Sequence, residues 1–88
     1  MVSYKIEIKK SAQKEIRKLS DDIREKIVDI INGLYNNPIP DDAKKIKGSK
    51  NIYRIRQGTY RIVYLVYKNK LTIIIVRVRH RKDAYQNL

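Results

Sequence analysis

The stretch "IYRIRQGTYRIVYLVY" (residues 52–67) sets the fold of this chain of 88 residues. Two runs rich in β-branched and aromatic residues, 52–56 and 59–67, are separated only by Gln57 and Gly58, which is typical of an antiparallel hairpin. A third such run, "LTIIIVRVR" (71–79), follows the short turn "KNK". The sequence therefore predicts three consecutive antiparallel strands.

The residues before this β-rich half predict one short strand and a first helix. "YKIEIKK" (4–10) alternates apolar and polar residues, as a strand with one buried face does. The apolar residues of that face are Tyr4, Ile6 and Ile8. Ser11 can then cap a helix. Three apolar residues recur in it at helical spacing: Ala12, Ile16 and Leu19.

A second helix follows at once. Ser20, Asp21 and Asp22 supply candidates for its N-cap and negative charge for its first turn. Its apolar stripe is formed by Ile23, Ile27, Ile30, Ile31 and Leu34. Gly33 and "NNPIP" (36–40) then end the helix. Two amphipathic helices joined this tightly should form an antiparallel hairpin that buries both apolar stripes.

Together these elements predict an α+β fold in the order β-α-α-β-β-β. The expected architecture is a twisted antiparallel sheet that includes the N-terminal strand, with the two-helix hairpin packed on one face. A basic loop, "KKIKGSKN" (44–51), leads from the helices to the last three strands. The length suits one modest core, so residues 1–88 are expected to form a single domain.

Composition argues against several functional classes. The chain has no cysteine and one histidine, so it offers no disulfide, no thiolate nucleophile and no ligand set for a zinc site. We therefore expect no metal or other cofactor. No apolar run approaches the roughly 20 residues of a membrane span, and "MVSYKIEIKKSAQ" (1–13) lacks the apolar block of a signal peptide. These features favour the cytoplasm.

The net charge of +12 comes from the second half of the chain. Residues 1–43 hold eight Lys or Arg and eight Asp or Glu, whereas residues 44–88 hold thirteen cations and one acid, Asp83. Such cations repel one another unless a polyanion accepts them. Nucleic acid, an anionic membrane surface and an acidic protein are the candidate partners, and a charged surface that serves only solubility is the alternative.

Arginines of the predicted strands are expected to come together. Arg54 and Arg56 share one face of their strand, and Arg61 lies among apolar neighbours in the next strand. An arginine is costly to bury, so Arg61 either extends its charged end to solvent or belongs to a site. The last strand ends in three further residues of this kind: Arg79, His80 and Arg81. One concave cationic face is the economical arrangement.

A phosphodiester suits such a face, because arginine forks match phosphate oxygens in pairs and stay charged. His80 is the one side chain of the type that exchanges protons near neutral pH, and the neighbouring cations should keep it a neutral base until phosphate binds. Tyr85 lies beyond the strand, where its ring can stack on an unpaired base or cover the sheet edge.

The order of elements, together with "KKIKGSKNIYRIRQGTYRIVYLV" (44–66) and "VRHRKDAY" (78–85), resembles the RelE toxins of the RelE/ParE superfamily, the toxic halves of bacterial and archaeal toxin-antitoxin pairs. The resemblance covers nearly the whole chain. It implies an mRNA interferase that enters the A site of the 30S ribosome, cuts messenger RNA there and so inhibits translation. The implied chemistry is metal-free attack by the 2'-hydroxyl, which leaves a 2',3'-cyclic phosphate and a 5'-hydroxyl.

The resemblance also implies roles for individual residues. Arg54 and Arg56 occupy the places of two functional lysines, one of which is considered the general base. Arg61 matches the arginine that holds the scissile phosphate, Arg81 the arginine at the leaving 5'-oxygen, and Tyr85 the tyrosine that stacks on the messenger base. The expected contacts with RNA or the ribosome are Lys44, Lys45, Lys47, Lys50, Arg54, Arg79 and Lys82.

The arginines at positions 54 and 56 depart from the family pattern. A guanidinium is a poor base, because only about one in 10⁵ or fewer is deprotonated at pH 7. We hypothesise that His80 acts as general base or acid, as histidine does in relatives of RelE, while the arginines act as electrostatic clamps. The expected catalytic set is Arg56, Arg61, His80, Arg81 and Tyr85.

Two alternatives to the nuclease stay open at this point. A ParE-like toxin shares the fold but acts on DNA gyrase, and a catalytically dead module that binds RNA or protein would look similar. The family also implies a RelB-like acidic antitoxin encoded by the adjacent gene. The toxin alone should be a monomer, and a heterotetramer can form through the antitoxin.

Overall fold

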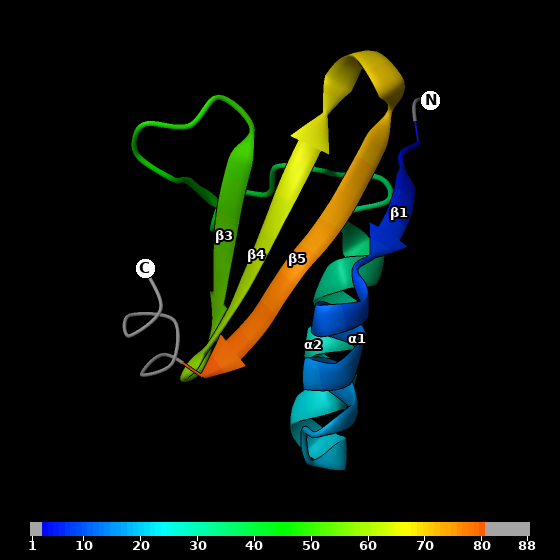
Figure 1. Ribbon diagram of the computed structural model, residues 1–88, viewed down its shortest axis with the longest axis vertical. Helices are drawn as coiled ribbons and strands as arrows, with labels where there is room; N and C mark the ends of the chain where they lie inside the picture. Colours follow the sequence, from blue (N-terminus) through cyan, green and yellow to red (C-terminus); the bar gives the residue numbers. More distant parts are fainter. Residues whose placement is uncertain (1–2, 81–88) are drawn as a thin grey trace.

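Within residues 3–80, which the computed structural model describes, five strands form one mixed sheet in the order β1-β5-β4-β3-β2 (Figure 1). The strands are β1 (Lys5–Ile8), β2 (Lys44–Lys45), β3 (Ile52–Gln57), β4 (Tyr60–Tyr67) and β5 (Thr72–His80). The α+β class and the predicted order of the long elements are confirmed.

Two features of the sheet differ from the prediction. β1 pairs in parallel with β5, whereas the other neighbouring pairs of the described sheet are antiparallel. Alternation of apolar residues fixes the face of a strand but not its direction, so the sequence did not reveal this. Lys44 and Lys45 were predicted in a loop and instead form β2 against β3. Both differences lie at the sheet edges, and the three long strands keep the predicted arrangement.

Tight turns join the three long strands. Gly58 and Thr59 form the loop between β3 and β4, since Gln57 pairs with Tyr60. Gly58 has a φ of +59°, which glycine adopts without the strain that a side chain would bring. A 3-10 turn, η1 (Lys68–Lys70), leads from β4 to β5. These short connections fix the register of the strands that carry the candidate site.

Two helices, α1 (Lys10–Arg17) and α2 (Asp21–Gly33), lie on one side of the sheet, with α1 along β5 (Figure 1). No helix within residues 3–80 has the length and apolar character to cross a membrane. Ser11 was predicted as the N-cap of α1, but Lys9 holds that position. The Ser11 hydroxyl instead donates a hydrogen bond to the Val76 carbonyl (3.4 Å), because the helix starts against the β5 edge.

Arg24 of α2 ties the two helices together. Its guanidinium donates hydrogen bonds to two carbonyl oxygens at the end of α1, those of Ile16 (3.2 Å) and Arg17 (3.1 Å), and to that of Leu19 (2.7 Å) in the connection that follows. It also donates to the Asp21 carboxylate (2.9 Å). The last carbonyls of a helix lack N–H partners within it. The Arg24 side chain therefore caps α1 from the neighbouring helix.

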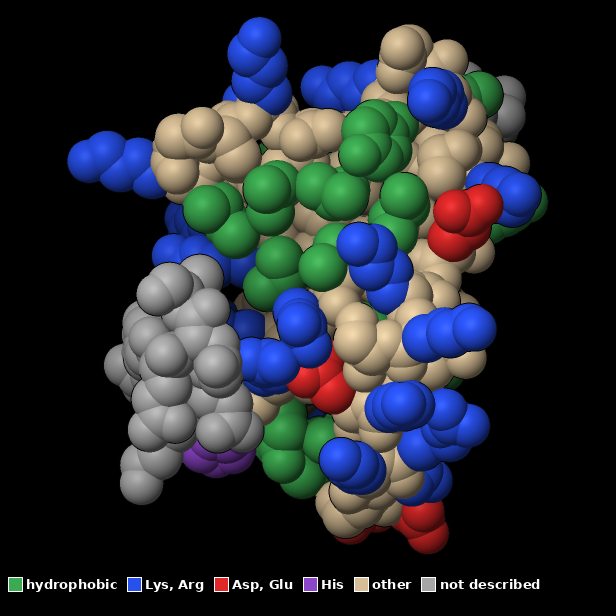
Figure 2. All heavy atoms as spheres, viewed as in Figure 1, with side chains coloured by type: hydrophobic (Ala, Val, Ile, Leu, Met, Phe, Trp, Pro, Cys, Tyr) green, Lys and Arg blue, Asp and Glu red, His purple; other side chains and the backbone are tan. Residues whose placement is uncertain are grey.

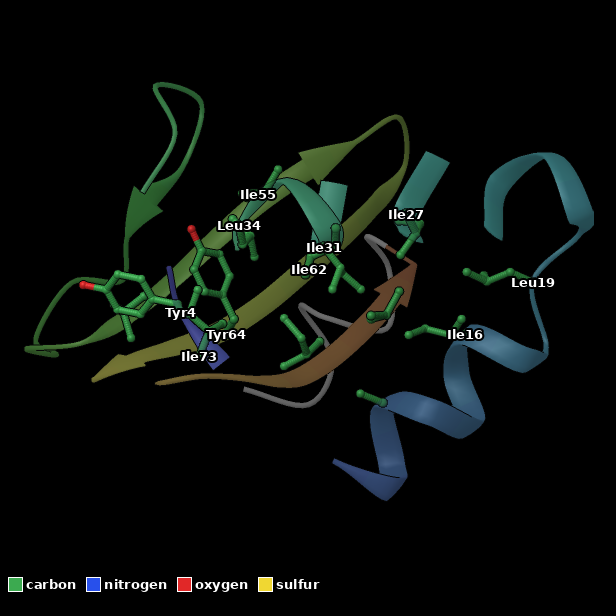
Figure 3. Close-up of a cluster of buried hydrophobic side chains, with 14 residues drawn as sticks. Tyr4, Ile16, Leu19, Ile27, Ile31, Leu34, Ile55, Ile62, Tyr64 and Ile73 are labelled. Atoms are coloured by element: carbon green, nitrogen blue, oxygen red, sulfur yellow. The ribbon is translucent and has the colours of Figure 1, made fainter. Parts of the chain in front are cut away.

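The core lies between the helices and the sheet, and Figure 3 shows its side chains meeting from both layers. Helical and strand positions contribute at the spacings that the sequence predicted. The buried residues are Tyr4, Ala12, Ile16, Leu19, Ile27, Ile31, Leu34, Ile55, Ile62, Tyr64, Val66, Ile73, Ile75 and Val78. The helices thus cover one face of the sheet, and the opposite face is left for other contacts.

Tyr64 is the largest of the fully buried side chains. Its hydroxyl donates a hydrogen bond to the Pro38 carbonyl (2.9 Å), and its ring stacks on Tyr53 with 5.9 Å between the ring centroids. Burial chiefly raises the pKa of Tyr64, and Tyr53 and Asp42 add to the effect through their charges. The Tyr64 hydroxyl therefore acts as a protonated donor that fixes the loop after α2.

Candidate nucleic-acid interface

The sheet face opposite the helices carries the arginines. Residues directly opposite each other in antiparallel strands point to the same face. Arg56 lies opposite Arg61, which lies opposite Arg79, so these three form an arginine row across β3, β4 and β5. In the next row, Arg54 and Arg77 oppose the same residue of β4 from either side. We call these five arginines the cationic face.

A β-bulge in β5 brings Arg77 and Arg79 to this face. The pairing of β4 with β5 shifts by one residue, so that Val76 has no opposite partner. Side chains alternate along a strand, and without the bulge Ile75 and Arg77 would both point into the core. The extra residue reverses the alternation. Val78 is buried instead, and the two arginines lie outside the core.

Arg61 occupies the centre of the row and is only 7% exposed, while Arg56 is exposed at one end. Like charges directly opposite one another destabilise a sheet. A guanidinium also keeps its proton at any ordinary pH. The row therefore concentrates permanent positive charge around Arg61, which suits an anion whose oxygens several guanidinium groups can share.

An apolar row lies beside the arginines on the same face. Ile52, Leu65 and Ile74 lie opposite one another in a row across the three long strands. Figure 2 shows hydrophobic side chains gathered over the upper part of the sheet, with Lys and Arg side chains around and below them. The face thus changes from apolar to cationic along β4. Only the cationic part is suited to a polyanion.

A hollow of about 390 Å³ adjoins the β3 end of the arginine row. It is lined by Asp41, Asp42, Lys44, Arg54 and Arg56. Its cations can meet phosphate, and its carboxylates can accept hydrogen bonds from the N–H groups of a base. Within residues 3–80, no three His, Asp or Glu side chains gather as a metal site would require. The hollow thus places cations and carboxylates side by side next to the arginine row.

The predicted lysines do not form one surface. Lys44 lies on the side of the cationic face, because its partner in β3 belongs to that face, and Lys45 lies on the opposite side. Lys45 and Lys50 line a second hollow of about 400 Å³ at the end of β4 farther from the arginine row. Lys47 is exposed in the loop between β2 and β3. Of these four lysines, only Lys44 joins the arginines.

His80 lies apart from the arginine row, which corrects the expectation of one face shared by all. Its partner in β4 is Tyr60, and the two rings meet edge to face with centroids 5.3 Å apart. Tyr60 packs against the core, so His80 points to the side of the sheet that the helices cover. Neighbouring residues of a strand point to opposite faces. Arg79 and His80 therefore cannot both belong to the cationic face.

Three predicted site residues, Arg81, Lys82 and Tyr85, lie outside the described residues, and their roles stay predictions. Sequence reasoning in turn missed two members of the described surface. Alternation within "VRVRH" (76–80) could have grouped Arg77 with the other arginines. Glu15 of α1 lies beside them, and nothing in the helical pattern pointed to its contact with a strand.

Comparison with known proteins identifies the family. The family model described as "ParE toxin of type II toxin-antitoxin system, parDE" matches residues 6–85. The toxin RelE3 of Methanocaldococcus jannaschii is 42% identical over 85 residues, which cover 92% of this chain and 94% of that protein. The mRNA interferase toxin RelE of Escherichia coli K12 is 30% identical over 88 residues, which cover 96% and 92% of the two chains.

The fold agrees with a solved structure of the same group. The chain is similar to a chain of the RelB-RelE antitoxin-toxin complex from Methanococcus jannaschii, with a TM-score of 0.79 and 37% identity, covering 93% of this chain and 98% of that one. The sequence and structural matches both extend over nearly the full length. This chain therefore belongs to the RelE-type toxins of the RelE/ParE superfamily.

Proposed function

We propose that this chain is the toxin of a RelBE-type toxin-antitoxin pair and that it cuts messenger RNA in the A site of the ribosome. The cationic face carries the proposal, because it gathers five arginines from three adjacent strands on one side of the sheet. The mRNA interferase from Escherichia coli supports it, since the alignment with that relative covers 96% of this chain.

The proposed reaction is a transesterification within the messenger. The 2'-oxygen attacks the adjacent phosphorus, the bond from phosphorus to the 5'-oxygen breaks, and a 2',3'-cyclic phosphate and a 5'-hydroxyl result. Water accepts the 2'-hydroxyl proton and returns one to the leaving oxygen, so atoms and charge balance without an oxidant or a reductant. Negative charge builds up on the phosphate oxygens in the transition state, and donors fixed in advance stabilise it.

The arginine row is the group of donors that meets this charge. We place the scissile phosphate against Arg61, with Arg56 and Arg79 on either side of it. One such donor typically contributes about 3 kcal/mol of transition-state stabilisation. The outer contacts in this proposal are Arg54 and Arg77 at neighbouring phosphates, Arg81 at the leaving oxygen, Tyr85 on the messenger base, and the lysines at the ribosome.

His80 has a smaller part in this proposal than the sequence suggested. Its ring packs on Tyr60 on the other side of the sheet from the arginine row. A group that transfers a proton must come within hydrogen-bond reach of the reacting oxygen, directly or through one water. We therefore propose that the arginines carry most of the rate enhancement.

Primer extension on messages in a reconstituted translation system tests this division of roles. The wild type should cut within translated codons, and Arg56→Ala should slow cutting by about 10²-fold. Because Arg56 is exposed, its loss should not disturb the core. His80→Ala should stay within about tenfold of the wild-type rate, since a true proton-transfer group contributes 10² to 10⁴. Lys26→Ala, which removes an exposed cation of α2, is the matched control.

The opposite ranking, a large loss for His80→Ala and none for Arg56→Ala, would contradict the proposed division. A ParE-like action on DNA gyrase is the second candidate, and the match to the ParE family model favours it. Inhibited supercoiling with intact messages would support that candidate against the nuclease. If neither messages are cut nor supercoiling is inhibited, the chain is a module that only binds RNA or protein.

We also propose that a RelB-like antitoxin is the partner that neutralises this chain. The similar structure from Methanococcus jannaschii is an antitoxin-toxin complex. An acidic antitoxin segment would be complementary to the cationic face, where arginines oppose arginines on neighbouring strands. Such a partner would relieve the repulsion within the row and exclude RNA from it at the same time.

A further inference from the structure

Helix α1 takes over from β1 as the outer partner of β5. β1 ends opposite Ile75, and the Lys9 N–H then donates to the Ile75 carbonyl (3.0 Å). Further along α1, the Glu15 carboxylate oxygen Oε1 accepts a hydrogen bond from the Val78 N–H (2.9 Å). A helix side chain thus satisfies a strand edge that would otherwise expose its N–H group.

The second oxygen of the same carboxylate reaches the cationic face. Glu15 Oε2 accepts a hydrogen bond from Arg79 Nε at 2.8 Å, and Arg77 Nη1 lies 3.8 Å from it. The side chains of Arg79 and Glu15 are only 23% and 21% exposed. Charged hydrogen bonds shielded from water in this way are stronger than those of exposed surface pairs. Glu15 therefore fixes both the backbone of β5 and one guanidinium of the row.

The contact with Glu15 uses only Nε of the Arg79 guanidinium. Nε is the donor that Glu15 occupies, so Nη1 and Nη2 remain to meet phosphate oxygens beside Arg61. The carboxylate also places a negative charge next to Arg77 and Arg79. These two arginines repel each other, and they also repel Arg61 on the neighbouring strand. It holds Arg79 close to Arg61 before any RNA arrives.

We infer that Glu15 is a positioning residue for RNA cleavage: it orients Arg79 within the arginine row so that the phosphate meets a site already formed. This inference rests on the proposed function. It assigns a role to a helix residue that does not itself contact the reacting atoms. Misplacing a group by about 1 Å can cost roughly 10²-fold in rate, so the loss of this anchor should be measurable.

The two oxygens of Glu15 allow the positioning role to be separated from a structural one. Glu15→Gln keeps one carbonyl oxygen, which can still accept the Val78 N–H, but removes the charge that holds Arg79. Glu15→Ala removes both contacts. Thermal unfolding should therefore report mainly the Val78 contact, and cleavage should report mainly the Arg79 contact.

Steady-state cleavage of ribosome-bound message tests the inference. Glu15→Gln should lower kcat by about tenfold with no rise in KM, because it removes a negative charge from a surface that binds a polyanion. Combined with Arg79→Ala, it should add no further loss. Glu7→Gln is the control, since Glu7 pairs with Lys5 at 3.3 Å on the exposed side of β1. This control should keep the wild-type kcat.

A wild-type kcat in Glu15→Gln, or losses that add to those of Arg79→Ala, would overturn the inference and leave the proposed function intact. A lower unfolding temperature with an unchanged kcat in both Glu15 variants would assign Glu15 a purely structural role, which also overturns it. If the wild type does not cut, or if Arg56→Ala cuts normally, the proposed function fails first and the inference fails with it.

Discussion

At the scale of single residues, Tyr64 links burial to a measurable pH dependence. Its hydroxyl donates to the Pro38 carbonyl from within the core, and burial raises its pKa above the ordinary value of 10.0. The unfolded chain therefore loses this proton at a lower pH than the folded chain does. The stability tied to Tyr64 should be present in full below pH 10 and should decline as the pH rises above it.

Tyr64→Phe tests this expectation. Near neutral pH the free energy of unfolding of the variant should be about 1 kcal/mol lower than that of the wild type, since the variant lacks one buried hydrogen bond. Well above pH 10 the wild type should lose about 1.4 kcal/mol of that difference per pH unit, until the variant becomes the more stable protein. Urea unfolding of both proteins between about pH 8 and about pH 11 measures the difference. A difference that stays constant with pH would contradict the role given to burial.

The residue scale also shows what strand alternation could predict about the site. Within β3 and β4, alternation placed Arg54 and Arg56 on one face and Arg61 on a face with apolar neighbours, and the pairing shows that the three arginines share a surface. The same rule, applied to the last strand, would have separated Arg79 from His80. The expectation that Arg79 and His80 share one face was wrong, because it relied on their closeness in sequence and not on the face to which each side chain points.

At the scale of elements, Arg24 adds to the stability of the α1–α2 hairpin. Arg24→Ala should lower the free energy of unfolding by about 1 to 3 kcal/mol, because several carbonyl groups lose a charged donor together. Lys26→Ala, an exposed change in the same helix, should alter it by less than about 0.5 kcal/mol. Chemical unfolding followed by circular dichroism measures both. Equal stability of the two variants would show that solvent caps α1 as well as Arg24 does.

The elements that sequence could not predict are those set by tertiary contacts. The direction of β1 depends on how the chain packs at the edge of the sheet beside β5, and the spacing of apolar residues carries no such information. The bulge at Val76 lies within the run "IIIVRV" (73–78), where apolar residues on both faces hide the change of alternation. The helices were predictable because their apolar stripes have a single period.

At the scale of the whole molecule, charge and core are kept on opposite sides of one sheet. Helices cover the face that holds the buried residues, and the cationic face lies on the other. The net charge of +12 attracts any polyanion at long range, whereas the cationic face offers guanidinium groups in rows that the strand register fixes. Long-range attraction and local contact can be separated by their response to salt.

Binding of a short single-stranded RNA, followed by fluorescence anisotropy, makes that separation. If each arginine of the cationic face meets one phosphate, the logarithm of affinity should fall against the logarithm of salt with a slope of about −3.5. Arg54→Ala and Arg77→Ala should each make the slope shallower by about 0.7, while Lys26→Ala should leave it unchanged, since Lys26 projects from α2. A slope that responds equally to helix and sheet cations would mean that RNA is held by the overall charge and not at the cationic face.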